Sequence, residues 1–174
     1  AHGARLRTLL CVEDNPANLK LVEELIARRP DLRLLTAVNG TLGIERARAS
    51  QPEMILMDVN LPDISGIEAM RILREDRVTA HIPIVALSAN AMPRDIRKGL
   101  EAGFFRYLTK PIKVNELMDT LRMALEFAEQ RAADPRRPLE MDRFTLAGTV
   151  KAEPPPAPAA RTTGLRILVA EDQE

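Results

Sequence analysis

The sequence contains few of the features that mark secreted, membrane or nucleic-acid-binding proteins. Its 174 residues include one cysteine, Cys11, so no internal disulfide framework can form, and this fits a reducing cytoplasm. No apolar stretch approaches the roughly 20 residues that a membrane-spanning helix needs. The 25 basic residues are balanced by 25 acidic ones, so net charge favours neither nucleic acid nor an anionic membrane as a partner. We therefore expect a cytoplasmic protein that contacts neither through this segment.

The residues that are present follow an alternating pattern. Hydrophobic residues make up 45% of the chain and charged residues 29%, which is typical of a globular protein. Short apolar runs rich in strand-forming residues alternate with stretches of helical periodicity. We expect strands at 9–12, 32–38, 54–57, 82–87 and 104–108, and helices at 16–29, 41–50, 64–75, 93–102 and 114–132. Such alternation predicts an α/β fold, in which a parallel sheet is covered by helices on both faces.

The composition changes after the last expected helix. Residues 134–163 hold six of the 13 prolines, so we expect a Pro/Ala-rich linker over residues 133–163, following a domain that spans residues 1–132. The segment "LRILVAEDQE" (165–174) then repeats the pattern of "RTLLCVEDNP" (7–16). We interpret residues 164–174 as the first strand of a second, truncated domain of the same kind. The chain is then expected to be part of a longer protein.

Polar side chains follow four of the five expected strands. The first strand runs into Glu13 and Asp14, the third into Asp58, the fourth into Ser88, and the fifth into Lys110. In an open parallel sheet, ligands bind at the carboxyl ends of the strands, so these groups should share one edge. Two or three carboxylates suit a hard cation such as Mg²⁺, while a lysine and a hydroxyl can bind phosphate oxygens. A carboxylate in this setting can attack phosphorus and form an acyl phosphate.

Each of these residues also has a purely structural interpretation. Acids and hydroxyls that follow strands often cap helices or start turns, and a lysine can simply be solvated. In that interpretation Glu13, Asp14 or Asn15 caps the helix near Pro16, Asp58 begins an Asx-turn, Ser88 caps a helix, and Lys110 lies on the surface. Taken together, however, five polar groups at four strand ends are not expected by chance, and we favour the functional interpretation.

Four motifs carry a resemblance to a known family. They are "CVEDN" (11–15), "ILMDVNLPDISG" (55–66), "IVALSANA" (84–91) and "YLTKPI" (107–112). In this order and at these separations, residues 6 to about 130 closely resemble the receiver domain of two-component signalling, the response-regulator family. The resemblance implies a doubly wound, flavodoxin-like sheet with strand order 2-1-3-4-5.

The resemblance also implies a phosphorylation site with its metal. Asp58 is then the phosphoacceptor, and Asp14 binds Mg²⁺ or Mn²⁺ directly. Glu13 helps to bind the metal through water, and the backbone carbonyl of Asn60 completes the protein ligands. The domain would catalyse its own magnesium-dependent phosphorylation and dephosphorylation.

The remaining matched residues are implied to read out the phosphorylated state. Lys110 contacts the phosphoryl group and precedes Pro111, whose peptide bond is usually cis in the family. Ser88 is the switch hydroxyl, at a position where many relatives carry threonine. Tyr107 is its aromatic partner, which turns inward on activation.

The predicted function is a phosphoacceptor switch that takes a phosphoryl group from the phosphohistidine of a histidine kinase or histidine phosphotransfer protein. Output, and a homodimer contact, are expected on the face formed by 93–102, 104–108 and 114–132. The parent protein is expected to be a hybrid histidine kinase, or else a tandem-receiver regulator. One alternative is a phosphatase of the haloacid-dehalogenase type, but that signature needs a second aspartate where this chain has Asn60. The other is a receiver-like docking module that works without phosphorylation.

Overall fold

Helices and strands alternate along the whole of the chain that the computed structural model describes, residues 5–133. The predicted linker and the predicted truncated strand lie outside the described residues, apart from residue 133. The elements are β1 (Arg7–Val12), α1 (Pro16–Ile26), β2 (Leu32–Ala37), α2 (Gly40–Ser50), β3 (Met54–Asp58), α3 (Gly66–Glu75), β4 (Ile84–Ser88), α4 (Pro93–Ala102), β5 (Arg106–Thr109) and α5 (Val114–Ala133).

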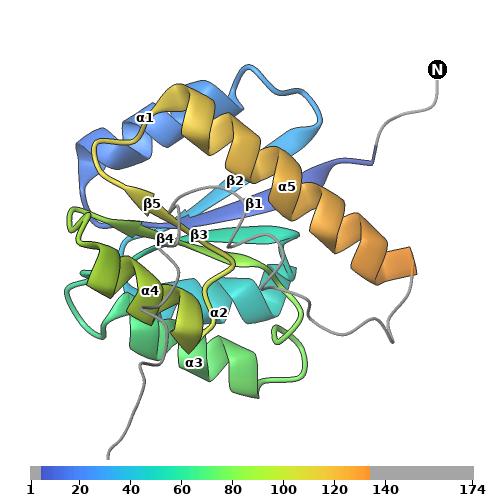
Figure 1. Ribbon diagram of the computed structural model, residues 1–174. Coiled ribbons are helices and arrows are strands. Elements are labelled where there is room, and N and C mark those ends of the chain that lie inside the picture. Colours follow the sequence, from blue (N-terminus) through green and yellow to red (C-terminus); the bar gives the residue numbers. More distant parts are fainter. Residues whose placement is uncertain (1–4, 134–174) are drawn as a thin grey trace, which may run out of the picture.

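The strands form one parallel sheet in the order β2-β1-β3-β4-β5. Helices α1 and α5 cover one face of this sheet, and α2, α3 and α4 cover the other (Figure 1). The predicted doubly wound fold and its strand order are therefore confirmed. The order reverses between β1 and β3, and this is where sheets of this kind bind ligands.

Alternate residues of the central strands feed two separate cores. In β1, Leu9 and Cys11 belong to the core under α1 and α5, whereas Leu10 and Val12 belong to the core under α2, α3 and α4. Both sets are at most 1% exposed. Because both faces are covered, the central strands are continuous apolar runs in the sequence. Burial of one leucine side chain stabilises the folded chain by about 2 kcal/mol.

Several boundaries differ from the sequence prediction by one to three residues, and two of these shifts have a plain physical reason. β4 begins at Ile84 instead of residue 82, directly after Pro83, which has no N–H to donate to a neighbouring strand. α3 begins at Gly66 instead of residue 64, because Ser65 is its N-cap and accepts a hydrogen bond from the Glu68 N–H at 3.1 Å. The loop between β3 and α3 is consequently longer than predicted.

That loop is tied to α2 through Asp63. One carboxylate oxygen of Asp63 accepts the Gly40 N–H at 2.8 Å, and the other accepts the Thr41 N–H at 2.8 Å and the Thr41 hydroxyl at 2.6 Å. Burial alone would raise the pKa of Asp63, but the hydrogen bonds from Thr41 and Gly40 outweigh it and hold the pKa below its usual range. An acid from another element thus helps to cap the first turn of α2.

We predict that Asp63→Ala lowers the free energy of unfolding by about 1 kcal/mol at neutral pH, because α2 loses this cap. A carboxyl group whose pKa is lower in the folded chain stabilises it above the unfolded pKa of about 4, and this contribution disappears as the pH falls. The difference between variant and wild type should therefore shrink below about pH 4, as measured by urea unfolding across pH. Asp119→Ala, at an exposed acid on α5, serves as the control. A loss that does not depend on pH would contradict the assignment.

Candidate functional site

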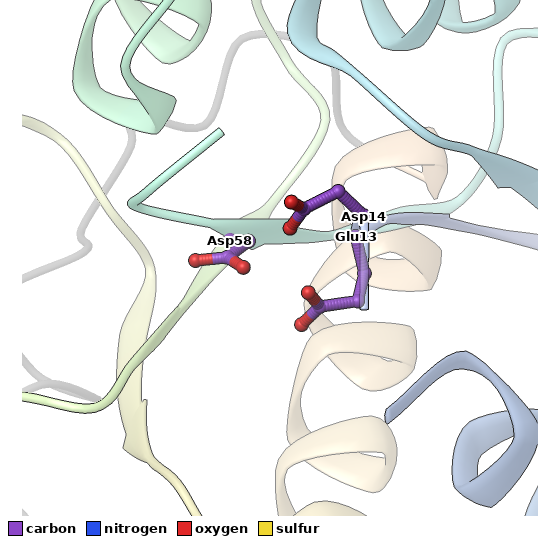
Figure 2. Close-up of side chains that lie close together, drawn as sticks. All are labelled: Glu13, Asp14 and Asp58. Atoms are coloured by element: carbon purple, nitrogen blue, oxygen red, sulfur yellow. The ribbon is translucent and has the colours of Figure 1, made fainter. Parts of the chain in front are cut away.

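Three carboxylates lie together where β1 and β3 end. Val12 is paired with Met57 in the sheet, so the residues that follow, Glu13 and Asp58, leave the sheet side by side. Ligand oxygens of Glu13, Asp14 and Asp58 all lie within 4.8 Å of one another, and Figure 2 shows the three side chains converging. Glu13 is fully buried and Asp58 is 2% exposed, whereas Asp14 is exposed. The structure thus brings the three predicted acids together.

The helix after β1 does not need these acids as caps. Asn15 is the N-cap of α1, and its side-chain oxygen accepts the N–H groups of Ala17 at 2.9 Å and Asn18 at 3.3 Å. Pro16 then occupies a position where its missing N–H costs nothing. Capping by Glu13 or Asp14 is therefore wrong.

Glu13 is anchored by three donors. One of its carboxylate oxygens accepts the Asn15 N–H at 3.0 Å. The other lies 3.3 Å from Asn18 Nδ2 and 2.8 Å from Lys110 Nζ. The sequence analysis missed Asn18, although it is the third residue of α1, a position from which side chains often reach back past the helix start.

Lys110 bridges two of the three acids, Glu13 and Asp58. Its Nζ lies 2.8 Å from an oxygen of Glu13 and 2.8 Å from Oδ2 of Asp58, and its side chain is 18% exposed. Its backbone N–H donates to the carbonyl of Ser88 at 2.7 Å, and its bond to Pro111 is cis, as the resemblance implies. The interpretation of Lys110 as a solvated surface lysine is therefore wrong.

The charges in this group shift one another's pKa. Burial raises the pKa of Glu13, and the neighbouring Asp58 adds to the rise, while Lys110 opposes it. Burial by itself would lower the pKa of Lys110, but its hydrogen bonds to Asp58 and Glu13 outweigh this and raise it. Lys110 is consequently protonated at physiological pH and compensates part of the buried negative charge.

Asp58 is held at the strand end by its own loop. Its Oδ1 accepts the backbone N–H of Asn60 at 2.8 Å, so the predicted Asx-turn exists alongside the contact to Lys110. α3 approaches closely here, since a Cβ atom on Gly66 would lie 2.2 Å from the carbonyl oxygen of Asp58. Gly66 also donates its N–H to Val59 at 2.8 Å. Only glycine allows the helix to start this close to Asp58.

Ser88 and Tyr107 lie on the two neighbouring strands. Ser88 is 1% exposed at the end of β4, and its Oγ accepts the backbone N–H of Asn90 at 3.0 Å. The N-cap of α4 is Met92, so the interpretation of Ser88 as a helix cap is wrong. Tyr107 is 4% exposed, and its hydroxyl lies 3.4 Å from the carbonyl oxygen of Asn90. Both predicted switch residues therefore contact the loop between β4 and α4.

The cluster of three carboxylates formed by Glu13, Asp14 and Asp58 could hold a metal ion. Carboxylate oxygens are the ligands that hard divalent cations prefer, and the exposed Asp14 gives a path from solvent to the two buried acids. Glu13 and Asp58 already share one cation, the ammonium of Lys110. The site is thus suited to positive charge.

Known proteins are similar to this chain in sequence and in fold. The profile of one family, described as the response regulator receiver domain, matches residues 9–122. The chain is 34% identical over 119 residues to the polar-differentiation response regulator DivK of Brucella anthropi, a match that covers 68% of this chain and 96% of the relative. It is also similar to the receiver domain of the sensor histidine kinase PA1611 of Pseudomonas aeruginosa PAO1, solved with a magnesium ion in its active-site cleft. That match has 34% identity and a TM-score of 0.63, and it covers 69% of this chain and 98% of the other. The chemotaxis response regulator CheY4 of Vibrio cholerae shares the fold, with 24% identity and a TM-score of 0.64, over 69% of this chain and 99% of its own.

The chain therefore belongs to the family of response regulator receiver domains, the phosphoacceptor switches of two-component signalling. Receiver domains interact with histidine kinases or phosphotransfer proteins, as predicted. Among the described residues, no helix combines the length and the apolar character that crossing a membrane requires.

We predict that Lys110→Met lowers the free energy of unfolding by about 2 kcal/mol. Losing one partner of a buried ion pair costs more than this, but partial exposure of Lys110 reduces the effect. Lys113→Met, which removes a lysine whose side chain is 73% exposed, is the control for urea unfolding. Adding a divalent cation such as Mg²⁺ should narrow the gap between Lys110→Met and wild type. Equal losses in the two variants would show that Lys110 does not stabilise the acids.

Proposed function

We propose that Asp58 accepts a phosphoryl group from the phosphohistidine of a histidine kinase or histidine phosphotransfer protein. The observation that carries this proposal is the ammonium of Lys110, which lies 2.8 Å from Asp58 at the edge of the sheet where ligands bind. A cation in this place can neutralise the charge of an incoming phosphoryl group.

Asp58 is a better nucleophile than the other two acids of the group. Glu13 is fully buried and three donors hold its carboxylate, against two for Asp58, so we place it as a support. Asp14 is exposed and lies in a helix-start segment next to the N-cap of α1. Asp58 is oriented on one oxygen by Asn60 and on the other by Lys110, so its carboxylate is fixed in position.

The proposed transfer is a displacement at phosphorus. A carboxylate oxygen of Asp58 forms a bond to phosphorus while the bond between phosphorus and the donor imidazole nitrogen breaks, and the nitrogen keeps the electron pair. Lys110 stays protonated and follows the negative charge onto the phosphoryl oxygens. Later attack by water on the acyl phosphate returns the free carboxylate of Asp58 and inorganic phosphate.

We infer that Glu13, Asp14 and Asp58, with the backbone carbonyl of Asn60, would hold Mg²⁺ or Mn²⁺. When bound, the ion would supply positive charge for the transferring phosphoryl oxygens. Asp14 is the exposed ligand, and Glu13 is held in place by Asn15, so the protein offers one accessible and one anchored acid. Among relatives, the receiver domain of PA1611 was solved with magnesium in its active-site cleft, which supports this inference.

Ser88 is the proposed switch hydroxyl. Its oxygen accepts the N–H of Asn90, which leaves its own O–H free to donate to a phosphoryl oxygen on Asp58. Asp58 is paired with Leu87 across the sheet, and Ser88 follows Leu87 directly. A short movement of the loop after β4 is therefore sufficient to bring the Ser88 hydroxyl to a phosphoryl group on Asp58. Phosphorylation would therefore be sensed by the loop that leads into α4.

The wider context is also a proposal. We place the chain in the cytoplasm, where ATP charges histidine kinases, as part of a hybrid histidine kinase. The receiver domain of PA1611, similar to this chain, comes from a sensor histidine kinase. The repeat of an apolar run with an acidic pair at 164–174 supports a second receiver joined through the linker at 133–163.

A homodimer would use the face of α4, β5 and α5, where the guanidinium of Arg106 is buried and contacts Met123.

We predict that Asp58→Asn abolishes phosphorylation by a small phosphodonor such as acetyl phosphate. The amide keeps the shape of the side chain but is not a nucleophile at phosphorus. The measurement is the mass of the intact full-length chain after incubation with donor and Mg²⁺. Asp119→Asn on α5 is the matched control and should be labelled like wild type. Label that persists in Asp58→Asn rules out Asp58 as the acceptor.

We predict that Asp14→Asn weakens binding of Mg²⁺ about tenfold, because an amide oxygen is a poorer ligand than a carboxylate for a hard cation. Calorimetric titration of the unphosphorylated full chain gives the affinity without any need for phosphoryl transfer. Glu24→Gln, an exposed acid on α1, is the control. If both variants bind Mg²⁺ as tightly as wild type, the metal lies elsewhere.

A further inference from the structure

Gly99 lies where α4 packs against the ring of Tyr107. A Cβ atom at Gly99 would lie 2.9 Å from Cδ2 and 3.0 Å from Cε2 of Tyr107, closer than such contacts normally come. The ring is itself buried, with 4% exposure, and packed interiors leave little room for movement. The Tyr107 ring therefore occupies space that any side chain at position 99 would need.

The backbone does not explain why a glycine stands there. Among the described residues, the glycine with positive φ is Gly103, the C-cap of α4, and Gly99 lies in the interior of the helix. A glycine in a helix interior is a much poorer helix former than alanine. Gly99 thus weakens α4, but it leaves the space that the Tyr107 ring occupies.

Tyr107 is connected to Ser88 through one loop residue. Its hydroxyl lies 3.4 Å from the carbonyl oxygen of Asn90, and the backbone N–H of Asn90 donates to Ser88 Oγ at 3.0 Å. The Asn90 side chain donates to Asp95 in the first turn of α4 at 2.6 Å and accepts from the backbone of Met92 at 3.0 Å. Because the N-cap of α4 makes no side-chain capping bond, Asn90 organises the start of this helix. A displacement of the Tyr107 ring would therefore shift Asn90 and alter its hydrogen bond to Ser88.

We infer that Gly99 is a positioning residue for Tyr107, and that through Tyr107 and Asn90 it controls how readily Ser88 responds to phosphorylation. This inference rests on the proposed role of Asp58 and Ser88. A methyl group at position 99 forces the ring out of its place beneath α4 and loosens its contact with the loop. The unphosphorylated chain then favours an arrangement in which Ser88 is poorly placed.

The position of the ring can be read directly. Tyr107 is the only tyrosine of the full chain, which has no tryptophan, so intrinsic fluorescence reports this ring alone. In Gly99→Ala, quenching by acrylamide should rise towards that of a free tyrosine derivative, with no phosphodonor present. Lys98→Ala, at the exposed neighbouring position of the same helix, should leave quenching unchanged.

Thermal unfolding gives a second, independent readout as a double-mutant cycle. In the wild-type background, Gly99→Ala should lower Tm because it displaces a packed ring. In a Tyr107→Leu background, the same change should raise Tm, because alanine is the better helix former. If Gly99→Ala raises Tm in both backgrounds and the ring stays protected from quencher, the inference is overturned.

The link to the site is tested with beryllium fluoride, an analogue of the phosphoryl group, in the presence of Mg²⁺. The beryllium fluoride concentration at half-saturation should be about fivefold higher for Gly99→Ala than for Lys98→Ala. Part of the binding free energy is then used to bring the Tyr107 ring back to its place beneath α4. An exposed ring with unchanged saturation would overturn the link to Ser88. If wild type itself binds no analogue and takes no phosphate on Asp58, the proposed function fails, while the quenching and unfolding results still decide the role of Gly99.

Discussion

One ammonium group between two buried carboxylates is the interaction on which this site depends. Glu13 and Asp58 leave adjacent strands side by side and are nearly inaccessible to water, an arrangement that costs several kcal/mol per charge if nothing compensates it. Lys110 reaches both from a third strand, at 2.8 Å each. The order of the strands makes this possible, because β1 and β3 are neighbours. β5 lies two strands from β3, and the long side chain of Lys110, directly after β5, spans that distance. The fold therefore supplies the acids and their counter-ion from different parts of the chain.

Close packing around the end of β3 keeps this group in place. Gly66 allows α3 to begin against the carbonyl of Asp58, and Asp63 in the intervening loop caps α2. Asn15 and Asn18 hold Glu13 from α1. The loops around the three acids are thus held by polar contacts to the helix starts, where backbone N–H groups lack partners within the helix. The loop after β4, by contrast, makes its contacts through Asn90.

The features carried by the apolar pattern could be predicted, and those that depend on single side-chain contacts could not. Apolar runs ending in Glu13, Asp58 and Lys110 predicted both the parallel sheet and the edge at which these residues meet, because the carboxyl ends of parallel strands share one edge. The contact of Asn18 with Glu13 and the packing of Gly99 on Tyr107 left no periodic signal, since each joins elements set by the fold. Strand and helix starts shifted where Pro83 and Ser65 impose local rules that the apolar pattern does not contain.

The count of formal charges favours a divalent cation at such a site. Three carboxylates and one ammonium leave two formal negative charges, which a divalent ion would neutralise. Without the ion, Lys110 is held by both Glu13 and Asp58, and an anionic donor meets a negative site. A divalent ion held by the acids would weaken their hold on Lys110, and its ammonium could then bind phosphoryl oxygens. The carboxylates that hold the lysine in this structure are thus the same ones that would hold the ion, so metal binding and the freedom of Lys110 would be coupled.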